Sequence, residues 1–450
     1  MDSSEFVKSH RPLRRLRCSV QHYDWGRMGQ DSLVGKVCAL NSGSEIQLDK
    51  PYAEFWMGIH PSGPSFVADG AGIGIANGNG NGNGAAINSH PHSDAAALSL
   101  KDWIVQNPSV LGDKVLDKWG SDLPFLFKIL SVAKALSIQA HPDKKLAKKL
   151  HKLHPNIYKD GSHKPEMALA VTEFEALCGF VSFEELKDVV RYIPEVVELI
   201  DSEDTSQLLH INDQVEVEKV KSILRSIFTQ LMSASKEMTT EAVSKLKIRL
   251  QMQSQVRRLT DKENLVLKLE KQYPGDIGVI SAFFLNHVKL NPGEALYLGA
   301  NEPHAYISGE CIEVMATSDN VVRAGLTPKH RDVQTLCSML TYKLGFPEIL
   351  KGFPLTPYIT RYLPPFDEFE MDRCFLPKGA STVFPAVEGP SIFVIIGGEG
   401  AMQAGSTSTR DVVMEGDVIF APAGTQINVK TVSELHLYRA GVNSRFLQTL

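Results

Sequence analysis

The chain has 450 residues, 43% of them hydrophobic, which is enough to bury two or three domain cores. Its net charge of −5 shows no excess of basic residues, so binding to nucleic acid or to an anionic membrane is not expected. No segment has the ~18 continuous apolar residues that a membrane span requires. Six scattered cysteines without a CxxC pair favour reduced thiols, and residues 1–17 lack the apolar core of a secretory signal, so we expect a cytoplasmic protein.

Short strands and turns are predicted first, over residues 13–64, because apolar runs alternate with breaks such as Trp25-Gly26 and His60-Pro61. The Asn-Gly repeat at residues 77–84 has no side chain able to bury apolar surface. We therefore interpret residues 69–94 as a flexible surface insertion that carries no chemistry.

An apolar strand predicted at residues 123–130 precedes the first candidate metal ligands, Gln139 and His141. Side chains two residues apart on an extended segment project from the same face, which is ligand spacing for a metal. Glu166 and His304, each after a proline, bring the offered ligands to four. Each piece alone has an ordinary explanation, as a polar pair on a strand or as turn residues.

Helical patterns follow the first ligand pair. Residues 144–154 place leucines on one side and lysines on the other, which is typical of a helix with a solvated basic face. A longer helical region spans about 182–272, where apolar residues recur at helical spacing without any catalytic motif. We predict that this block is a helical domain inserted into a β scaffold.

Strand signals return from Gly275, and a short arrangement occurs twice. Residues 295–298 follow Gly293-Glu294 as residues 418–421 follow Gly416-Asp417, and each precedes a turn with proline. The first turn delivers His304, whereas the second delivers neither a histidine nor a carboxylate. We infer two related antiparallel barrels or sandwiches, of which the first binds metal.

Three ligand segments closely resemble motifs of the type I phosphomannose isomerases: LSIQAHPDK, HKPEMA, and NEPHAYISGE with the following IEVMATSDNVVRAG. The resemblance extends from the YDWG and YAEFWMG segments, at residues 23–26 and 52–58, to at least Pro328-Lys329. The cupin-type jelly rolls of that family agree with the repeated arrangement. The predicted fold class is therefore mainly β, with an inserted α-helical domain and two cupin-type jelly-roll barrels.

The predicted domains are a metal-binding catalytic cupin domain at 1–180 with 273–335, a helical domain at 181–272, and a C-terminal cupin-like domain at 336–450 without metal ligands. The proposed ligands combine nitrogen and oxygen donors with one formal negative charge, which suits zinc but also manganese, iron or cobalt. The resemblance favours one zinc ion per chain. Because no cysteine takes part, the site is expected to be open to water or substrate.

The resemblance implies a zinc-dependent aldose-ketose isomerase that interconverts D-mannose 6-phosphate and D-fructose 6-phosphate. Such a reaction opens the sugar ring and moves a proton between carbons 2 and 1 through an enediol or enediolate. The implied role is to supply mannose phosphate for GDP-mannose synthesis. We expect a monomer whose partner is a small sugar phosphate, with neither nucleic acid nor membrane as a partner.

The proton-transfer base is expected next to Glu166, at His163 or Lys164, and the sequence does not divide the role between them. By resemblance Lys128 is a candidate for ring opening, against the alternative of a lysine at a strand edge. Glu313 either orients the site or takes part in proton transfer, and Asp319 is interpreted as structural.

Arg323 either pairs with an acid or, as the resemblance favours, stabilises the enediolate or holds the phosphate. Lys329 is expected to anchor the phosphate together with the hydroxyl of Ser137. Tyr306 either faces the substrate or packs in a core. Trp25 and Trp56 are interpreted as packing residues.

Two other classes of protein fit part of the pattern. A redox cupin such as an iron dioxygenase could use a comparable metal shell, although the ligand set and the neighbouring lysine and arginine motifs argue against it. A noncatalytic sugar-binding or regulatory protein is the other class, because a fold does not establish turnover. Every expected motif position is occupied, so degeneration is not evident.

Overall fold

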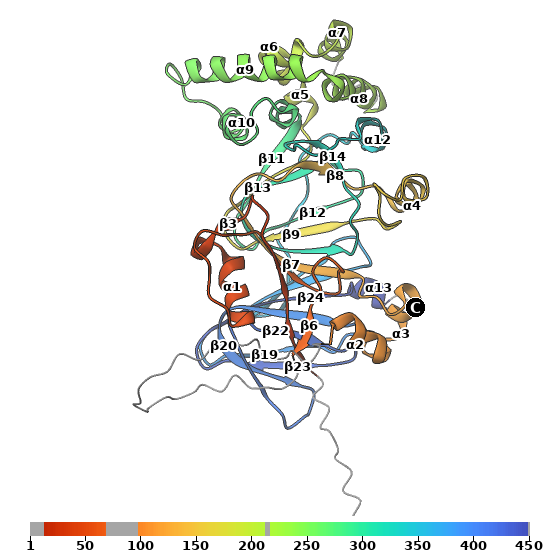
Figure 1. The fold of residues 1–450 in the computed structure, drawn as a ribbon, viewed down its shortest axis with the longest axis vertical. Coiled ribbons are helices and arrows are strands. Elements are labelled where there is room, and N and C mark those ends of the chain that lie inside the picture. The colour runs from red at the N-terminus through yellow and green to blue at the C-terminus, as the bar shows by residue number, and fades with distance from the viewer. Residues whose placement is uncertain (1–12, 69–97, 212–216, 449–450) are drawn as a thin grey trace, which may run out of the picture.

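A computed structural model describes residues 13–68, 98–211 and 217–448 of the chain. The predicted Asn/Gly-rich insertion at 69–94 lies outside these residues. The described part is mainly β, with a group of helices gathered at one end of the molecule and the strands stacked beneath them (Figure 1). This arrangement confirms the mainly β class with a helical insertion.

One sheet carries every segment that contributes a predicted metal ligand. Its strand order is β15(Ile349–Leu350), β12(Ala295–Leu298), β9(Glu166–Ala170), β13(His304–Ala316), β7(Phe125–Val132), β5(Glu54–Met57) and β2(Ser19–Gln21). Off this path, β10(Phe174–Phe180) and β8(Ile138–Ala140) pair with β13, β11(Leu285–Leu290) pairs with β10, and β14(Val322–Gly325) pairs with β8. The long strand β13 is therefore the element that holds the site together.

A second sheet is built mainly from C-terminal strands. Its path is β16(Phe353–Thr356), β17(Ile359–Tyr362), β18(Glu370–Leu376), β24(Leu435–Gly441), β20(Ser391–Ala404), β22(Val418–Ala421), β1(Arg14–Arg17) and β6(Phe66–Ala68). β19(Ser381–Phe384), β21(Asp411–Met414) and β23(Ile427–Lys430) attach to its side, and β3(Arg27–Met28) pairs separately with β4(Pro51–Tyr52). The N-terminal segment thus contributes β1 to this sheet and β2 to the other.

The predicted helical region forms helices that pack through their apolar stripes. They are α5(Phe183–Tyr192), α6(Pro194–Val197), α7(Ser202–His210), α8(Val217–Ser233), α9(Lys236–Gln253) and α10(Asp261–Gln272). Capping boxes at Ser182 and Thr260 start α5 and α10, because each side chain accepts the amide of a glutamate three residues on. On α8 the predicted stripe from Val220 to Leu231 is buried.

The next helix, α11(Ile277–Ser281), and the 3-10 turn after it occupy residues for which strand was predicted, so that prediction was wrong up to Leu285, where β11 begins. A short apolar run does not distinguish a buried helix from a buried strand.

The other α-helices border the sheets: α1(Leu33–Ser42), α2(Leu100–Gln106), α3(Asp113–Trp119), α4(Lys144–Leu153), α12(Val333–Met339) and α13(Ser444–Gln448). Three 3-10 turns complete the described elements: η1(Gly29–Asp31), η2(Pro108–Leu111) and η3(Ala282–Phe284). Among the described helices, none combines the length and apolarity that a membrane crossing requires.

Both copies of the repeated arrangement form strands, as β12 and β22. Within the described residues, the hydrogen-bonded path of each of the two large sheets runs between two edges and does not close. The two jelly-roll barrels and the domain boundaries therefore stay predictions.

Candidate metal centre and adjoining cavity

Strand pairing brings together three of the four predicted metal ligands. His141 follows β8, Glu166 begins β9 and His304 begins β13, and one donor atom from each lies within 4.8 Å of the others. Nε2 of His141 is 3.3 Å from one carboxylate oxygen of Glu166, and Nε2 of His304 is 3.4 Å from the other. All three side chains are buried.

The two histidines are oriented as metal ligands. Nδ1 of His141 lies 2.6 Å from the carbonyl oxygen of Asn320, and Nδ1 of His304 lies 3.0 Å from that of Glu302. A carbonyl accepts only from an N–H, so each Nε2 keeps its lone pair. Both buried Nε2 atoms lack a hydrogen-bond partner among the described residues, which a metal ion would supply.

The electrostatics of this group also fit a cation. Burial lowers the pKa of His141 to about 4, which keeps the ring neutral and able to ligate. Burial alone would raise the pKa of Glu166, but the charge of Lys164, whose Nζ is 3.2 Å away, opposes it, and the pKa lies well below its ordinary value. Two neutral imidazoles and one carboxylate are a donor set that suits a divalent metal such as zinc.

Gln139, the fourth predicted ligand, lies in register beside this group. On β8 it pairs with His304 of β13 on one side and with Arg323 of β14 on the other. Its side chain lines the cavity next to the three donors, and its oxygen is 3.5 Å from the hydroxyl of Ser137. Its role as a ligand stays a prediction.

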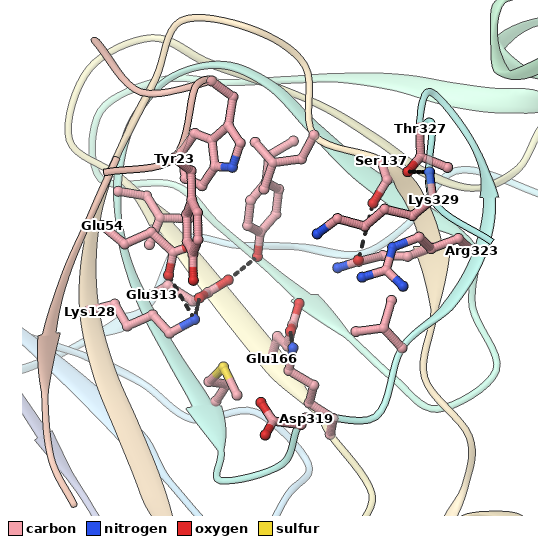
Figure 2. A pocket seen from close by; sticks show the side chains of 18 of the residues that line it. Tyr23, Glu54, Lys128, Ser137, Glu166, Glu313, Asp319, Arg323, Thr327 and Lys329 are labelled. Carbon is pink, nitrogen blue, oxygen red and sulfur yellow. Dashed lines mark hydrogen bonds and ion pairs between the residues drawn. The ribbon is translucent and has the colours of Figure 1, made fainter. Parts of the chain in front are cut away.

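A cavity with a volume of about 430 Å³ opens beside Gln139 and Glu166, and we name it the main cavity because it adjoins the candidate metal centre. Figure 2 shows Glu54, Lys128 and Glu313 on one side of it, Ser137, Arg323 and Lys329 on the opposite side, and Glu166 between the two groups. Trp56 of β5, Lys128 of β7 and Glu313 of β13 are direct strand neighbours, so their side chains share the face that lines the cavity. The register of three strands therefore builds this wall.

Lys128 lies between two buried carboxylates. Its Nζ is 3.1 Å from an oxygen of Glu54 and 3.1 Å from an oxygen of Glu313. Burial lowers the pKa of Lys128, but the charges of Glu313 and Glu54 outweigh this and raise it above its ordinary value. For Glu313, burial and the charges of Glu166 and Glu54 raise the pKa despite the opposing charge of Lys128.

A bulge in β13 sets the direction of Tyr306 relative to Glu313. The pairing of β13 with β10 shifts between Tyr306 and Ser308, next to Gly309 at φ 114°. Side chains alternate along a regular strand, so residues seven apart would face opposite sides without this extra residue. Here both line the cavity, and the Tyr306 hydroxyl donates a 2.8 Å hydrogen bond to Glu313. Tyr306 is thus buried and also faces the cavity.

The opposite wall of the cavity is cationic. Arg323 and Lys329 line it together with Ser137 (Figure 2), and neither cation forms an ion pair with a carboxylate of the described residues. Burial lowers the pKa of Arg323, but a guanidinium remains charged under ordinary conditions. Two cations beside a hydroxyl, without acidic partners, form a place for an anion. The predicted residues Arg323, Lys329 and Ser137 are therefore brought together.

The two base candidates separate. Lys164 lines the main cavity, with its Nζ 3.2 Å from Glu166. His163 instead lines a neighbouring cavity, where its Nε2 lies 2.7 Å from Glu368. The two neighbouring side chains therefore face different cavities, and the position of His163 does not support the expectation that it faces the reaction.

Asp319, interpreted from sequence as structural, also lines the main cavity. Its carboxylate is 3.3 Å from Nε2 of the buried His60, and this contact lowers the pKa of Asp319. Sequence reasoning missed His60 and Glu54, and it interpreted Trp56 as packing alone, although Trp56 lines the cavity and its indole donates to Glu54 at 2.6 Å. Glu54 could have been predicted from its position two residues before Trp56 in an otherwise apolar strand, where a buried acid needs a partner.

Comparison with known proteins agrees with this site. The family pattern for the catalytic domain of type I phosphomannose isomerase matches residues 13–80 and 82–183, and the pattern for its helical insertion domain matches 199–285. Mannose-6-phosphate isomerase 1 of Arabidopsis thaliana is 63% identical over 97% of this chain and 95% of its own length. The chain belongs to the type I phosphomannose isomerase family.

Further phosphomannose isomerases match over nearly all of their length. The human mannose-6-phosphate isomerase is 38% identical over 94% of this chain and 97% of its own. A crystal structure described as mannose 6-phosphate isomerase bound with zinc and yttrium superposes with a TM-score of 0.75 at 27% identity, covering 96% of this chain and all of that one. This member of the family is accordingly an isomerase.

Proposed function

We propose that this chain interconverts D-mannose 6-phosphate and D-fructose 6-phosphate with one zinc ion held by His141, Glu166, His304 and Gln139. The observation that carries the proposal is the pair of buried Nε2 atoms without partners, held beside Glu166 at the edge of a cavity lined with lysine and arginine. The names of the related proteins support the same substrate.

Different residues of the cavity bind different parts of the substrate in this proposal. Lys329 and Ser137 hold the phosphate, because a cation and a hydroxyl donor match its oxygens. Arg323 pairs with Gln139 across β8 and β14, so its guanidinium lies near the metal centre and can stabilise negative charge on a substrate oxygen. In this proposal the reacting carbons lie between the cationic wall and Lys164.

Proton movements are assigned to residues that face the substrate. Lys128 and Glu313 serve ring opening. Their contact at 3.1 Å puts a proton donor and a proton acceptor side by side, as opening the sugar ring requires. Lys164, rather than His163, moves the proton between carbons 2 and 1 through the enediol or enediolate. When bound, the zinc ion supplies electrophilic stabilisation of the developing oxygen charge without a redox change.

The biological setting follows from this reaction. Mannose 6-phosphate made from fructose 6-phosphate feeds GDP-mannose synthesis, and we propose that the chain supplies this route as a cytoplasmic monomer. The six cysteines, all free thiols, support a reducing compartment. The cupin-type jelly rolls expected from sequence belong to the same proposal.

The decisive experiment is an isomerase assay on metal-stripped protein. Chelation should abolish conversion of mannose 6-phosphate, and zinc alone should restore it under anaerobic conditions. An iron dioxygenase would need oxygen, and a noncatalytic binding protein would bind the sugar without turnover. Failure of zinc to restore turnover to folded protein would reject the proposal.

A further inference from the structure

Asp160 joins two loops that border the metal centre. One of its carboxylate oxygens accepts from the Ser318 hydroxyl at 2.8 Å, and the other accepts from the backbone N–H of Asp319 at 2.8 Å. The loop of Asp160 leads through Lys164 to the ligand Glu166, and the loop of Ser318 leads to Arg323. A single carboxylate therefore ties the segment that carries Lys164 and Glu166 to the segment that carries Arg323.

Asn320 extends this connection to a metal ligand. Its side-chain N–H group donates to the carbonyl oxygens of Asp160, at 2.8 Å, and Ser162, at 2.9 Å. Asn320 is 1% exposed, and its backbone carbonyl oxygen lies 2.6 Å from Nδ1 of His141. The contacts form a continuous chain from Asp160 through Asn320 to the imidazole.

This chain explains how an irregular loop can hold a ligand group in place. Residues 154–165 contain neither helix nor strand, so the backbone ladder does not position them. The hydrogen bonds of Asp160 and Asn320 replace that ladder, fixing both the ring of His141 and its spacing from Glu166. Partners behind the ligands commonly set metal affinity in this way.

We propose that Asp160 and Asn320 are positioning residues that set the affinity of the centre for zinc. Neither residue lines the main cavity, so they act through His141 and the loop of Glu166 rather than on the substrate. The inference rests on the proposed zinc site.

The test compares Asp160→Asn with the parent chain in one zinc titration, using competition with a chromogenic chelator. An amide keeps the shape of the carboxylate but replaces one acceptor oxygen by a donor. Whichever oxygen is replaced, the new donor faces a backbone N–H, that of Ser162 at 2.9 Å or that of Asp319 at 2.8 Å. The expected result is a loss of zinc affinity of about 10–100-fold. Asp261→Asn is the matched control, because that exposed acid pairs with Lys289 at 2.7 Å, away from the centre.

Two further measurements separate positioning from general stability. Metal-free Asp160→Asn should melt close to the Asp261→Asn control, and excess zinc should restore most of its turnover. Unchanged zinc affinity, or a fall in melting temperature without a change in affinity, would overturn the inference. If Asp160→Asn does not fold, Ser318→Ala tests the inference in its place. It removes one hydrogen-bond donor to Asp160 and should weaken zinc binding several-fold. A parent chain that binds no zinc would instead reject the proposed function.

Discussion

Replacing Lys128 by methionine tests the charge balance of the cavity wall. The substitution keeps a long side chain in place of the lysine but leaves Glu54 and Glu313 buried without the ammonium group that lies 3.1 Å from each. Removing one partner from a buried ion pair costs about 3–5 kcal/mol, because an uncompensated charge remains in a medium of low polarity. We expect a loss of that size in the free energy of unfolding at pH 8.

The loss should shrink as the pH falls. Burial raises the pKa of Glu313 above its ordinary value of 4.5, and removal of Lys128 raises it further. A carboxyl with a raised pKa in the folded protein stabilises the fold below its unfolded pKa, and this contribution disappears as the pH rises through the folded pKa. The difference between variant and parent should therefore be smallest near pH 4.5 and grow toward pH 8.

Urea unfolding of metal-free protein at pH 5 and pH 8 measures this effect without a contribution from metal release. Tryptophan fluorescence is a suitable signal, because Lys128 Nζ lies 5.0 Å from the centre of the Trp56 ring. Lys289→Met, at an exposed ion pair, is the control and should change stability little. Adding Glu54→Gln should recover part of the loss. Equal losses at both pH values, or no recovery in the double variant, would refute the reasoning.

Three further predictions concern turnover and metal binding. Arg323→Ala should keep its zinc and lose about 10²–10³-fold in kcat, measured at saturating substrate, and normal turnover would count against its role. Lys164→Met should lose about 10²–10⁴-fold in kcat whereas His163→Ala keeps most of it, and the reverse order would return the proton transfer to His163. His141→Ala should contain almost no zinc by elemental analysis after dialysis, and retention of one ion per chain would exclude His141 as an essential ligand.

Local patterns in the sequence were sufficient for the elements and the kinds of donor. Helical spacing predicted the buried stripe of α8, and the apolar run at 123–130 predicted β7, in which every residue is buried. The extended spacing of Gln139 and His141 predicted a metal site because side-chain direction along a short strand repeats every two residues. These features depend on neighbours in the chain.

The walls of the cavity depended on contacts between distant segments. Sequence could not divide the base between His163 and Lys164, since the direction of each side chain follows from how the loop is held by Asp160 and Glu368. Glu54 was missed because its importance arises from Lys128, which strand pairing places beside it.

The amino-acid order was thus enough to establish the donor types, the helical insertion and the class of chemistry. Which donors meet, and which neighbours face the cavity, followed from strand register and from the bulge in β13. The physical reason is that a shift of one residue in register, or one extra residue in a strand, reverses the direction of every later side chain without altering the local pattern.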